Sequence, residues 1–306
     1  MLWTEKYRPK KINELIGQPH FVMDAEHWIK DLDMPNVLLY GVAGTGKTTA
    51  GLVLANSILD NDFEGNFFEI NASDDRKLET VRNKIKDIAT TRKLGDAPFK
   101  IVLLDEMDGM TKDAQNALKR IMERYSNNCR FIITCNDRYK IIQPLISRCA
   151  NYGFQRLDNN SMRFALEKVI QNETVNGTPI VDVNELEPFI DGLHGDLRRG
   201  ITELQAAVSG KTSLLKQTQV LLKPFENILK NINDNKHDEA LKEVHKLLYQ
   251  SLDMKTICVG LHDVIINSDL EHSTKFRLLR VVGETEWRSG NMTPKVLASW
   301  MIGQMK

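Results

Sequence analysis

The sequence predicts an α/β domain built on a parallel sheet, followed by helices to the end of the chain. In the first part of the chain, short apolar runs alternate with stretches of helical periodicity. A glycine-rich loop also separates one such run from a helix, and strand patterns stop after about residue 155. Strands that alternate with helices form parallel sheets covered by helices on both faces. The chain has 306 residues, which is long for one domain.

Four short apolar runs are expected to form the strands, at residues 37–40, 67–70, 100–104 and 130–134. Helices are expected between them at 48–59, 78–88 and 113–125, where apolar residues recur every three or four positions. Ligands bind beyond the carboxyl ends of parallel strands. Gly41, Asp105 and Asn136 each follow a strand, so they are candidate ligand-binding residues.

The remainder of the chain reads as helical. Helices are expected at 161–172, 183–193 and 197–209, and further helices fill residues 216–306. The resulting division has three parts: an α/β nucleotide-binding domain over 1–155, a helical domain over 156–215 and a second helical domain over 216–306.

Composition limits the possible functions. The hydrophobic fraction is 42%, and 41 basic residues balance 41 acidic ones, so whole-chain charge does not indicate nucleic-acid binding. The first residues lack the apolar stretch of a secretory signal, and no run approaches a membrane span, so no membrane is expected. The four cysteines form no Cys-x-x-Cys pair, and a zinc site is not expected.

The loop Gly41-Val-Ala-Gly-Thr-Gly-Lys47-Thr48 matches the full phosphate-binding pattern between a strand and a helix. Its glycines let backbone N–H groups approach phosphate oxygens closely, and the following helix adds its dipole. Lys47 supplies a charge near the β- and γ-phosphates, and Thr48 a hydroxyl for Mg²⁺. The match in this context favours ATP with Mg²⁺ over an ordinary glycine turn.

Asp105 and Glu106 end the apolar strand at 100–104. Mg²⁺ prefers hard oxygen ligands, which suits Asp105, and hydrolysis requires a base for water, which suits Glu106. Two acids at a strand end are also common as solvated charges. Their place behind four apolar residues and after a phosphate loop favours the catalytic interpretation.

Several motifs together resemble the AAA+ ATPases, and within them the small subunits of replication factor C, the sliding-clamp loader. The resemblance covers Trp3 to about residue 210. It rests on these segments: Trp3-Thr-Glu-Lys-Tyr-Arg-Pro-Lys10, Leu15-Ile-Gly-Gln18, Asn71-Ala-Ser-Asp-Asp-Arg76, Asp113-Ala-Gln-Asn-Ala-Leu118, Thr134-Cys-Asn136, Ser147-Arg-Cys149 and Gly195-Asp-Leu-Arg-Arg199.

The chain departs from the family pattern at three places. Val42 and Ala43 replace two prolines, and the acidic box reads Asp-Glu-Met-Asp in place of Asp-Glu-Ala-Asp. Both essential acids remain. After residue 210 the chain matches only in length and helical character, and its shortness for the family hints at a viral or otherwise divergent source.

The resemblance implies a nucleotide site with a helical lid over 156–215. Asn136 would position the attacking water or contact the γ-phosphate, and Arg198 would reach the phosphates from the lid, with Arg199 as the alternative. Arg8 as a surface charge and Ile16 as a core residue are equally compatible with the sequence. The implied nucleotide-binding residues are Thr4, Arg8, Ile16, Gly41, Val42, Ala43, Gly44, Thr45, Gly46, Lys47, Thr48, Thr49, Asn136 and Arg198, with Thr48 and Asp105 for the metal.

Arg148, within Ser147-Arg-Cys149, corresponds to the arginine finger of clamp loaders and would act on ATP held by a neighbouring subunit. Such fingers contribute about 10³–10⁵ in rate. The spacing alone fits a surface arginine equally well.

Residues 76–100 carry eight basic and three acidic side chains, a local excess of +5. Basic residues without interleaved aromatic residues suit DNA backbone contacts that are independent of sequence. A solvated helix face is the other interpretation, and the resemblance favours DNA. The DNA candidates are Arg76, Arg82, Lys84 and Arg120, and Arg76 is hypothesised to couple DNA contact to Glu106.

The resemblance implies one subunit of a hetero-pentamer that opens a ring-shaped, PCNA-like clamp and loads it onto primer-template DNA at the intracellular site of replication. Residues 216–306 would form its collar. Another DNA motor, such as a branch-migration helicase, is the main alternative. A protein-remodelling machine is disfavoured because residues 71–100 lack an aromatic–apolar–glycine pore loop. Lys47, Asp105 and Glu106 disfavour a purely structural use of ATP.

Overall fold

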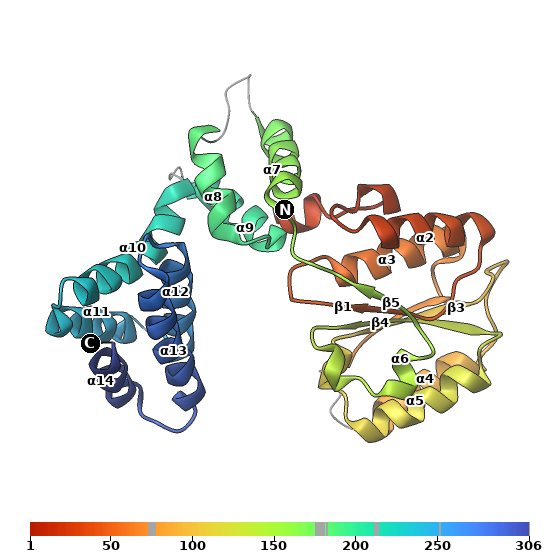
Figure 1. Cartoon of the computed structure of the whole chain (residues 1–306). Helices are drawn as coiled ribbons and strands as arrows, with labels where there is room; N and C mark the ends of the chain where they lie inside the picture. Colours follow the sequence, from red (N-terminus) through yellow and green to blue (C-terminus); the bar gives the residue numbers. More distant parts are fainter. Residues whose placement is uncertain (73–77, 175–180, 182, 211–213, 251, 306) are drawn as a thin grey trace. The chain divides into compact units, whose positions relative to one another are not determined.

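The computed structural model describes residues 1–72, 78–174, 181, 183–210, 214–250 and 252–305. They form two compact units, Met1–Lys211 and Thr212–Lys306. The first unit contains the sheet together with helices α7 to α9, and the second is helical (Figure 1). The three-part division drawn from the sequence stays a prediction.

A five-stranded sheet forms the centre of the first unit, with the order β2-β3-β4-β1-β5 and parallel pairing throughout. This confirms the predicted α/β class. The sequence did not indicate β5, because this edge strand is half exposed and lacks an apolar run. The strands are β1 (Val37–Tyr40), β2 (Phe67–Asn71), β3 (Lys100–Asp105), β4 (Cys129–Cys135) and β5 (Ala150–Gly153).

Helices alternate with these strands, and the helices α7, α8 and α9 follow the last strand of the unit. They are α1 (Trp3–Lys6), α2 (Pro19–Asp31), α3 (Lys47–Leu59), α4 (Leu78–Thr90), α5 (Lys112–Arg124), α6 (Gln143–Ile146), α7 (Asn159–Glu173), α8 (Leu186–Leu193) and α9 (Leu197–Gly210). Short 3₁₀ turns lie at Ile12–Glu14, Asp60–Asp62, Met107–Gly109, Arg138–Lys140 and Val183–Glu185. Side-chain caps begin α5 and α7: Thr111 accepts a hydrogen bond from Ala114 N, and Asp158 accepts one from Ser161 N.

The sheet is buried on both faces. Along β1, Val37 and Leu39 pack with α2 and α3, whereas Leu38 packs into the core beneath α4 and α5. Figure 1 shows α2 and α3 on one face of the sheet and α4, α5 and α6 on the other. This alternation explains why the strands read as continuous apolar runs.

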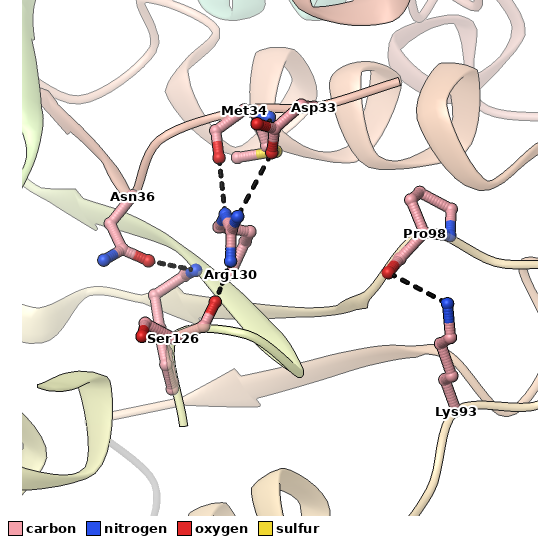
Figure 2. Close-up of polar contacts among 8 residues, drawn as sticks. Asp33, Met34, Asn36, Lys93, Pro98, Ser126 and Arg130 are labelled. Atoms are coloured by element: carbon pink, nitrogen blue, oxygen red, sulfur yellow. Dashed lines mark hydrogen bonds and ion pairs between the residues drawn. The ribbon is translucent and has the colours of Figure 1, made fainter. Parts of the chain in front are cut away.

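Arg130, the second residue of β4, ties together loops at the amino-terminal edge of the sheet (Figure 2). Its guanidinium donates to the carbonyls of Met34 (2.6 Å) and Ser126 and to Asp33 Oδ1 (3.1 Å). Asn36 links three strands there: its Oδ1 accepts from Phe131 N (2.9 Å), and its carbonyl from Ala150 N (2.8 Å). These bonds hold the starts of β1, β4 and β5 in register.

The second unit is a helical bundle around one apolar core. Its core includes Ile228, Val244, Ile257, Leu297 and Met301, all buried. The helices are α10 (Leu214–Asn233), α11 (His237–Tyr249), α12 (Met254–Asn267), α13 (His272–Arg288) and α14 (Pro294–Gln304). Among the described residues, no helix combines the length and apolarity that crossing a membrane requires.

Phe131→Ala should strongly destabilise the first unit, since Phe131 is fully buried in β4. A large-to-small change in a packed core costs about 3–5 kcal/mol. Phe164→Ala is the matched control, because Phe164 is 63% exposed, and its effect should stay within about 0.5 kcal/mol. Thermal unfolding followed by near-UV circular dichroism measures both. Equal losses for the two variants would contradict the assigned packing.

Candidate nucleotide site

The loop between β1 and α3 has a backbone that requires glycine. Gly41 and Gly44 have φ angles of +145° and +82°. A Cβ at Gly41 would lie 2.1 Å from the carbonyl oxygen of Phe154, and one at Gly44 would lie 2.6 Å from Asp196 Oδ1. Side chains are therefore excluded at both positions by conformation and by space.

The ammonium group of Lys47, the first residue of α3, lies within this loop. Its Nζ donates to the carbonyls of Gly41 and Val42 (both 2.8 Å) and to Asn136 Oδ1 (3.0 Å). Lys47 is 7% exposed, and burial lowers the pKa of its ammonium group, opposed by the charges of Asp105 and Asp108. These three neutral acceptors surround a cation that has lost most of its water, which favours an anionic ligand beside it.

Asp105 ends β3 and accepts two hydroxyl hydrogen bonds on one oxygen. Thr48 Oγ1 donates to Asp105 Oδ1 at 2.8 Å, and Thr134 Oγ1 donates to the same atom at 2.5 Å. Thr134 in turn accepts from the backbone N–H of Glu106 at 3.1 Å. The Asp105 carboxylate is thus fixed beside the phosphate loop.

Glu106 follows in a left-handed conformation, with φ of +54°, and its side chain is exposed. Asn136 follows β4, and its backbone N–H donates to Asp108 Oδ1 at 3.2 Å. Since its side-chain oxygen accepts from Lys47, Asn136 connects the loop after β3 to the phosphate loop.

Gln115, on α5, joins the loops that follow β3 and β4. Its side chain is fully buried, and its Nε2 donates to the carbonyls of Met110 (3.1 Å) and Lys140 (3.0 Å). Its Oε1 accepts from Ile142 N at 2.8 Å. The positions of Glu106 and Asn136 therefore depend on a common support.

Two cavities meet at the phosphate loop. The larger, about 640 Å³, is lined by Thr4, Arg8 and Ile16 from the N-terminal segment and by Ile201 from α9. The smaller, about 280 Å³, is lined by Lys47, Thr48, Asp105, Glu106 and Asn136. They share these residues: Arg8, Gly44, Gly46, Thr49 and Arg198. A nucleoside and its phosphates match this pair of adjoining spaces.

The structure brings most of the predicted nucleotide-binding residues to these cavities. Ala43 lines the smaller one and Thr45 the larger one. Gly41 and Val42 line neither, and their carbonyls instead hold Lys47. Their role in nucleotide binding stays a prediction.

Arg198 and Arg199, on the first turn of α9, differ in surroundings. Arg198 is exposed and lines both cavities. Arg199 lines neither, and its Nε donates to Glu203 Oε1 at 2.6 Å along the helix. The structure thus places Arg198, rather than its neighbour, at the phosphate loop.

Three site residues were absent from the predicted set. Thr134 orients Asp105 and Glu106, as described above. Asp196 lies against Gly44 and caps α9 by accepting from Arg199 N at 3.0 Å. Glu69 lines the smaller cavity, where burial and the charge of Asp105 raise its pKa while Arg8 opposes the shift. Thr134 and Asp196 stand in segments that carry the family resemblance, whereas Glu69 had no sequence signal.

Arg148 lies at the opposite edge of the sheet from the phosphate loop. It precedes β5, whose Ala150 pairs with Val37 at the start of β1, whereas the loop follows the end of β1. Four strand residues span roughly 13 Å. Its guanidinium bonds the Glu123 carboxylate and the carbonyl of Pro144. In this chain, Arg148 therefore belongs to a different surface from Lys47.

The DNA candidates lie away from both cavities as far as they are described. Lys84 on α4 and Arg120 on α5 are exposed. Arg76 falls outside the described residues, and the side chain of Arg82 is also outside them. Lys100, which was counted in the basic excess, is buried at 2% exposure, so it cannot belong to a basic surface. Its Nζ donates to the carbonyl of Ile88 at 3.2 Å, near the end of α4.

Comparison with known proteins decides the family. The family model described as "ATPase family associated with various cellular activities (AAA)" matches residues 37–157. Replication factor C small subunits match almost the whole chain. The chain belongs to this family. Relatives include those of Methanococcus vannielii (35% identity, 94% of this chain and 92% of that one) and Saccharolobus solfataricus (38%, 94% and 88%).

This family member is an ATP hydrolase, as its AAA domain and its relatives show. Among solved structures, the RuvB Holliday junction branch migration motor of Thermotoga maritima is similar, with a TM-score of 0.58. It covers 83% of this chain and 85% of its own at 16% identity. This likeness supports the AAA+ fold and does not extend to the branch-migration activity.

Arg198→Ala should weaken ATP hydrolysis by about 10- to 100-fold, because it removes a cation from the phosphate cavity. Arg199→Ala is the matched control on the same helical turn and should change the rate less than about twofold, since Arg199 pairs with Glu203. Steady-state phosphate release measures both rates. A larger loss in Arg199→Ala would reverse the assignment.

Proposed function

We propose that this replication factor C small subunit is one ATPase subunit of a sliding-clamp loader, which opens a ring-shaped clamp and loads it onto primer-template DNA. The observation that carries the proposal is the complete phosphate site around Lys47, Asp105 and Glu106 in a chain of this family. The names of its relatives supply the connection to replication. Its place of action is the intracellular site of DNA replication.

In the proposed mechanism, Lys47 exchanges the carbonyls of Gly41 and Val42 for phosphate oxygens of ATP. Burial disfavours the charge of Lys47, and the anionic phosphates oppose this effect by favouring the charged ammonium group. The adenosine occupies the larger cavity beside Thr4, Arg8 and Ile16. Arg198 contacts the phosphates from α9.

Thr48 and Asp105 fit Mg²⁺, since a hydroxyl and a carboxylate oxygen meet at 2.8 Å beside the phosphate cavity. Both are hard oxygen donors, and Mg²⁺ keeps several waters beyond such protein ligands. Bound Mg²⁺ would supply charge neutralisation at the β- and γ-phosphates. The Thr134 hydroxyl keeps the Asp105 carboxylate oriented toward this position.

Glu106 accepts the proton of the attacking water, and Asn136 orients that water. Both residues line the phosphate cavity, and both loops are held by Gln115. Proton removal by a positioned carboxylate contributes about 10²–10⁴ in rate.

Arg148 completes the site of a neighbouring subunit. Arg148 lies at the opposite edge of the sheet from the phosphate loop of its own chain and cannot reach a nucleotide bound there. This supports action on the nucleotide of a neighbouring subunit. The guanidinium would exchange its Glu123 partner for the neighbour's γ-phosphate and stabilise charge there.

The second unit is proposed to form a collar with other subunits of a hetero-pentamer. Phe276 and Trp287 on α13 are 72% and 77% exposed. They are eleven positions apart, which places them on one face of the helix. Exposed aromatic side chains on one face support coverage by a partner.

DNA contact is proposed through Arg82 and Lys84 of α4, Arg120 of α5, and Arg76, which lies outside the described residues. Lys84 and Arg120 are exposed on helices that share one core. Contacts of this kind neutralise phosphates and carry no sequence information, which suits primer-template junctions of any sequence.

The assembled loader should hydrolyse ATP faster with primed DNA and a PCNA-like clamp than with either alone. Arg76→Ala should lose most of this stimulation and keep the basal rate if Arg76 couples DNA contact to Glu106. Lys30→Ala, on α2, is a control outside the proposed DNA surface. Phosphate release is the measurement. A wild-type rate indifferent to both DNA and clamp would refute the clamp-loader proposal.

Lys47→Ala and Arg148→Ala should each abolish hydrolysis. The first variant no longer binds ATP, and the second no longer supplies an arginine finger to the ATP of its neighbour. In oligomers that mix the two variants, an Arg148→Ala subunit can bind ATP and receive Arg148 from a Lys47→Ala neighbour. Activity should therefore return to a fraction of the wild-type rate. An arginine finger contributes about 10³–10⁵ in rate, so the recovery should be large compared with either variant alone. No recovery on mixing, with oligomers intact by light scattering, would contradict action in trans.

A further inference from the structure

The N-terminal segment, residues 1–8, is fastened to the α7–α9 helices at two places. At the first, Trp3 N donates to Gln205 Oε1 of α9 at 2.9 Å, and Gln205 Nε2 donates to the carbonyl of Met1 at 3.2 Å. The Trp3 side chain is buried, at 9% exposure. The start of the segment therefore belongs structurally with α9.

The second fastening is made by Glu173, the last residue of α7. Its Oε1 accepts from the Tyr7 hydroxyl at 2.6 Å and from the Lys6 ammonium group. The Glu173 side chain is 19% exposed. Hydrogen bonds from Lys6 and Tyr7 hold the pKa of Glu173 below its ordinary value, and the same contact raises the pKa of Lys6. Both directions indicate a charged pair in the folded protein.

Residues 4–8 of this segment all line the larger cavity, so the fastened residues Lys6 and Tyr7 are part of its wall. Thr4 follows Trp3, and Arg8 follows Tyr7, whose ring packs edge-on against the Trp3 ring with centroids 6.4 Å apart. Beyond Arg8 the chain enters the α/β core at Ile12, which is buried with Phe21. The segment thus bridges α7–α9 and the sheet along one wall of the cavity.

We propose that Glu173 is a positioning residue for adenosine binding, because it holds Lys6 and Tyr7 and thereby fixes Arg8 and the segment 1–8 as one wall of the pocket. This inference rests on the proposed nucleotide site. Without Glu173, the segment keeps its hydrogen bonds to Gln205 near Trp3 and loses the contacts of Lys6 and Tyr7 beside Arg8. Binding of the nucleoside part weakens, while the phosphate loop around Lys47 is unchanged.

The test compares ATP with inorganic tripolyphosphate, which carries the phosphates without adenosine. Glu173→Gln should raise the Kd for ATP by about 3- to 10-fold, as expected when a charged hydrogen-bond acceptor is replaced by a neutral one. The Kd for tripolyphosphate and the rate at saturating ATP should stay within about twofold of wild type. Tyr7→Phe, which keeps the ring, should give a smaller loss in the same direction. Isothermal titration calorimetry measures both ligands.

Glu187→Gln is the matched control, because Glu187 pairs with Arg163 on the same three helices and lines neither cavity. It should leave both Kd values unchanged. An unchanged ATP Kd in Glu173→Gln, or equal weakening of ATP and tripolyphosphate, would overturn the inference. Wild-type protein that binds neither ligand would instead overturn the proposed nucleotide site, so the two failures are distinguishable.

Discussion

The parallel register of β1, β3 and β4 is the constraint on which the rest of the site depends. Leu38 pairs with Ile133, and Leu103 pairs with Ile132, so the carboxyl ends of the three strands finish at one edge. That edge carries the phosphate loop, the Asp105 carboxylate and Asn136. Apolar burial on both faces fixes the register, since a one-residue slip would turn core side chains toward the wrong face. The core therefore sets the distances on which the chemistry relies.

The polar groups of the site are hydrogen-bonded to one another, and a bound ligand would replace some of these partners. The Lys47 ammonium group donates to the loop carbonyls, and the Thr48 hydroxyl donates to Asp105. Buried polar groups without partners are costly, and the protein supplies partners for both of these groups from its own loops. When ATP binds, the protein exchanges these internal hydrogen bonds for hydrogen bonds to the nucleotide. The binding free energy is therefore the difference between the two sets of bonds.

The sequence predicted the parts of the site that are contiguous or end a strand. Gly41 to Thr48 is a local pattern, and Asp105, Glu106 and Asn136 follow apolar runs, so both could be found by reading along the chain. Glu69 reaches the smaller cavity only through tertiary packing, and no local feature marks it. Asp196 stands within the quoted segment Gly195-Asp-Leu-Arg-Arg199, but its contact with Gly44 depends on tertiary packing. The edge strand β5 was not predicted because it is only partly buried and lacks an apolar run. Lys100 was counted with the basic surface residues because composition does not distinguish a buried lysine from an exposed one. The resemblance had already favoured Arg198 over Arg199, and the placed helix brings Arg198 to both cavities.

The left-handed backbone of Glu106 has a consequence for how this protein can be improved. A non-glycine residue with positive φ costs about 1 kcal/mol, and glycine would remove that strain. The same replacement would delete the carboxylate proposed to take the proton from water. Thermostability and turnover are therefore opposed at this single position, and selection for a more heat-resistant chain alone would tend to remove its chemistry.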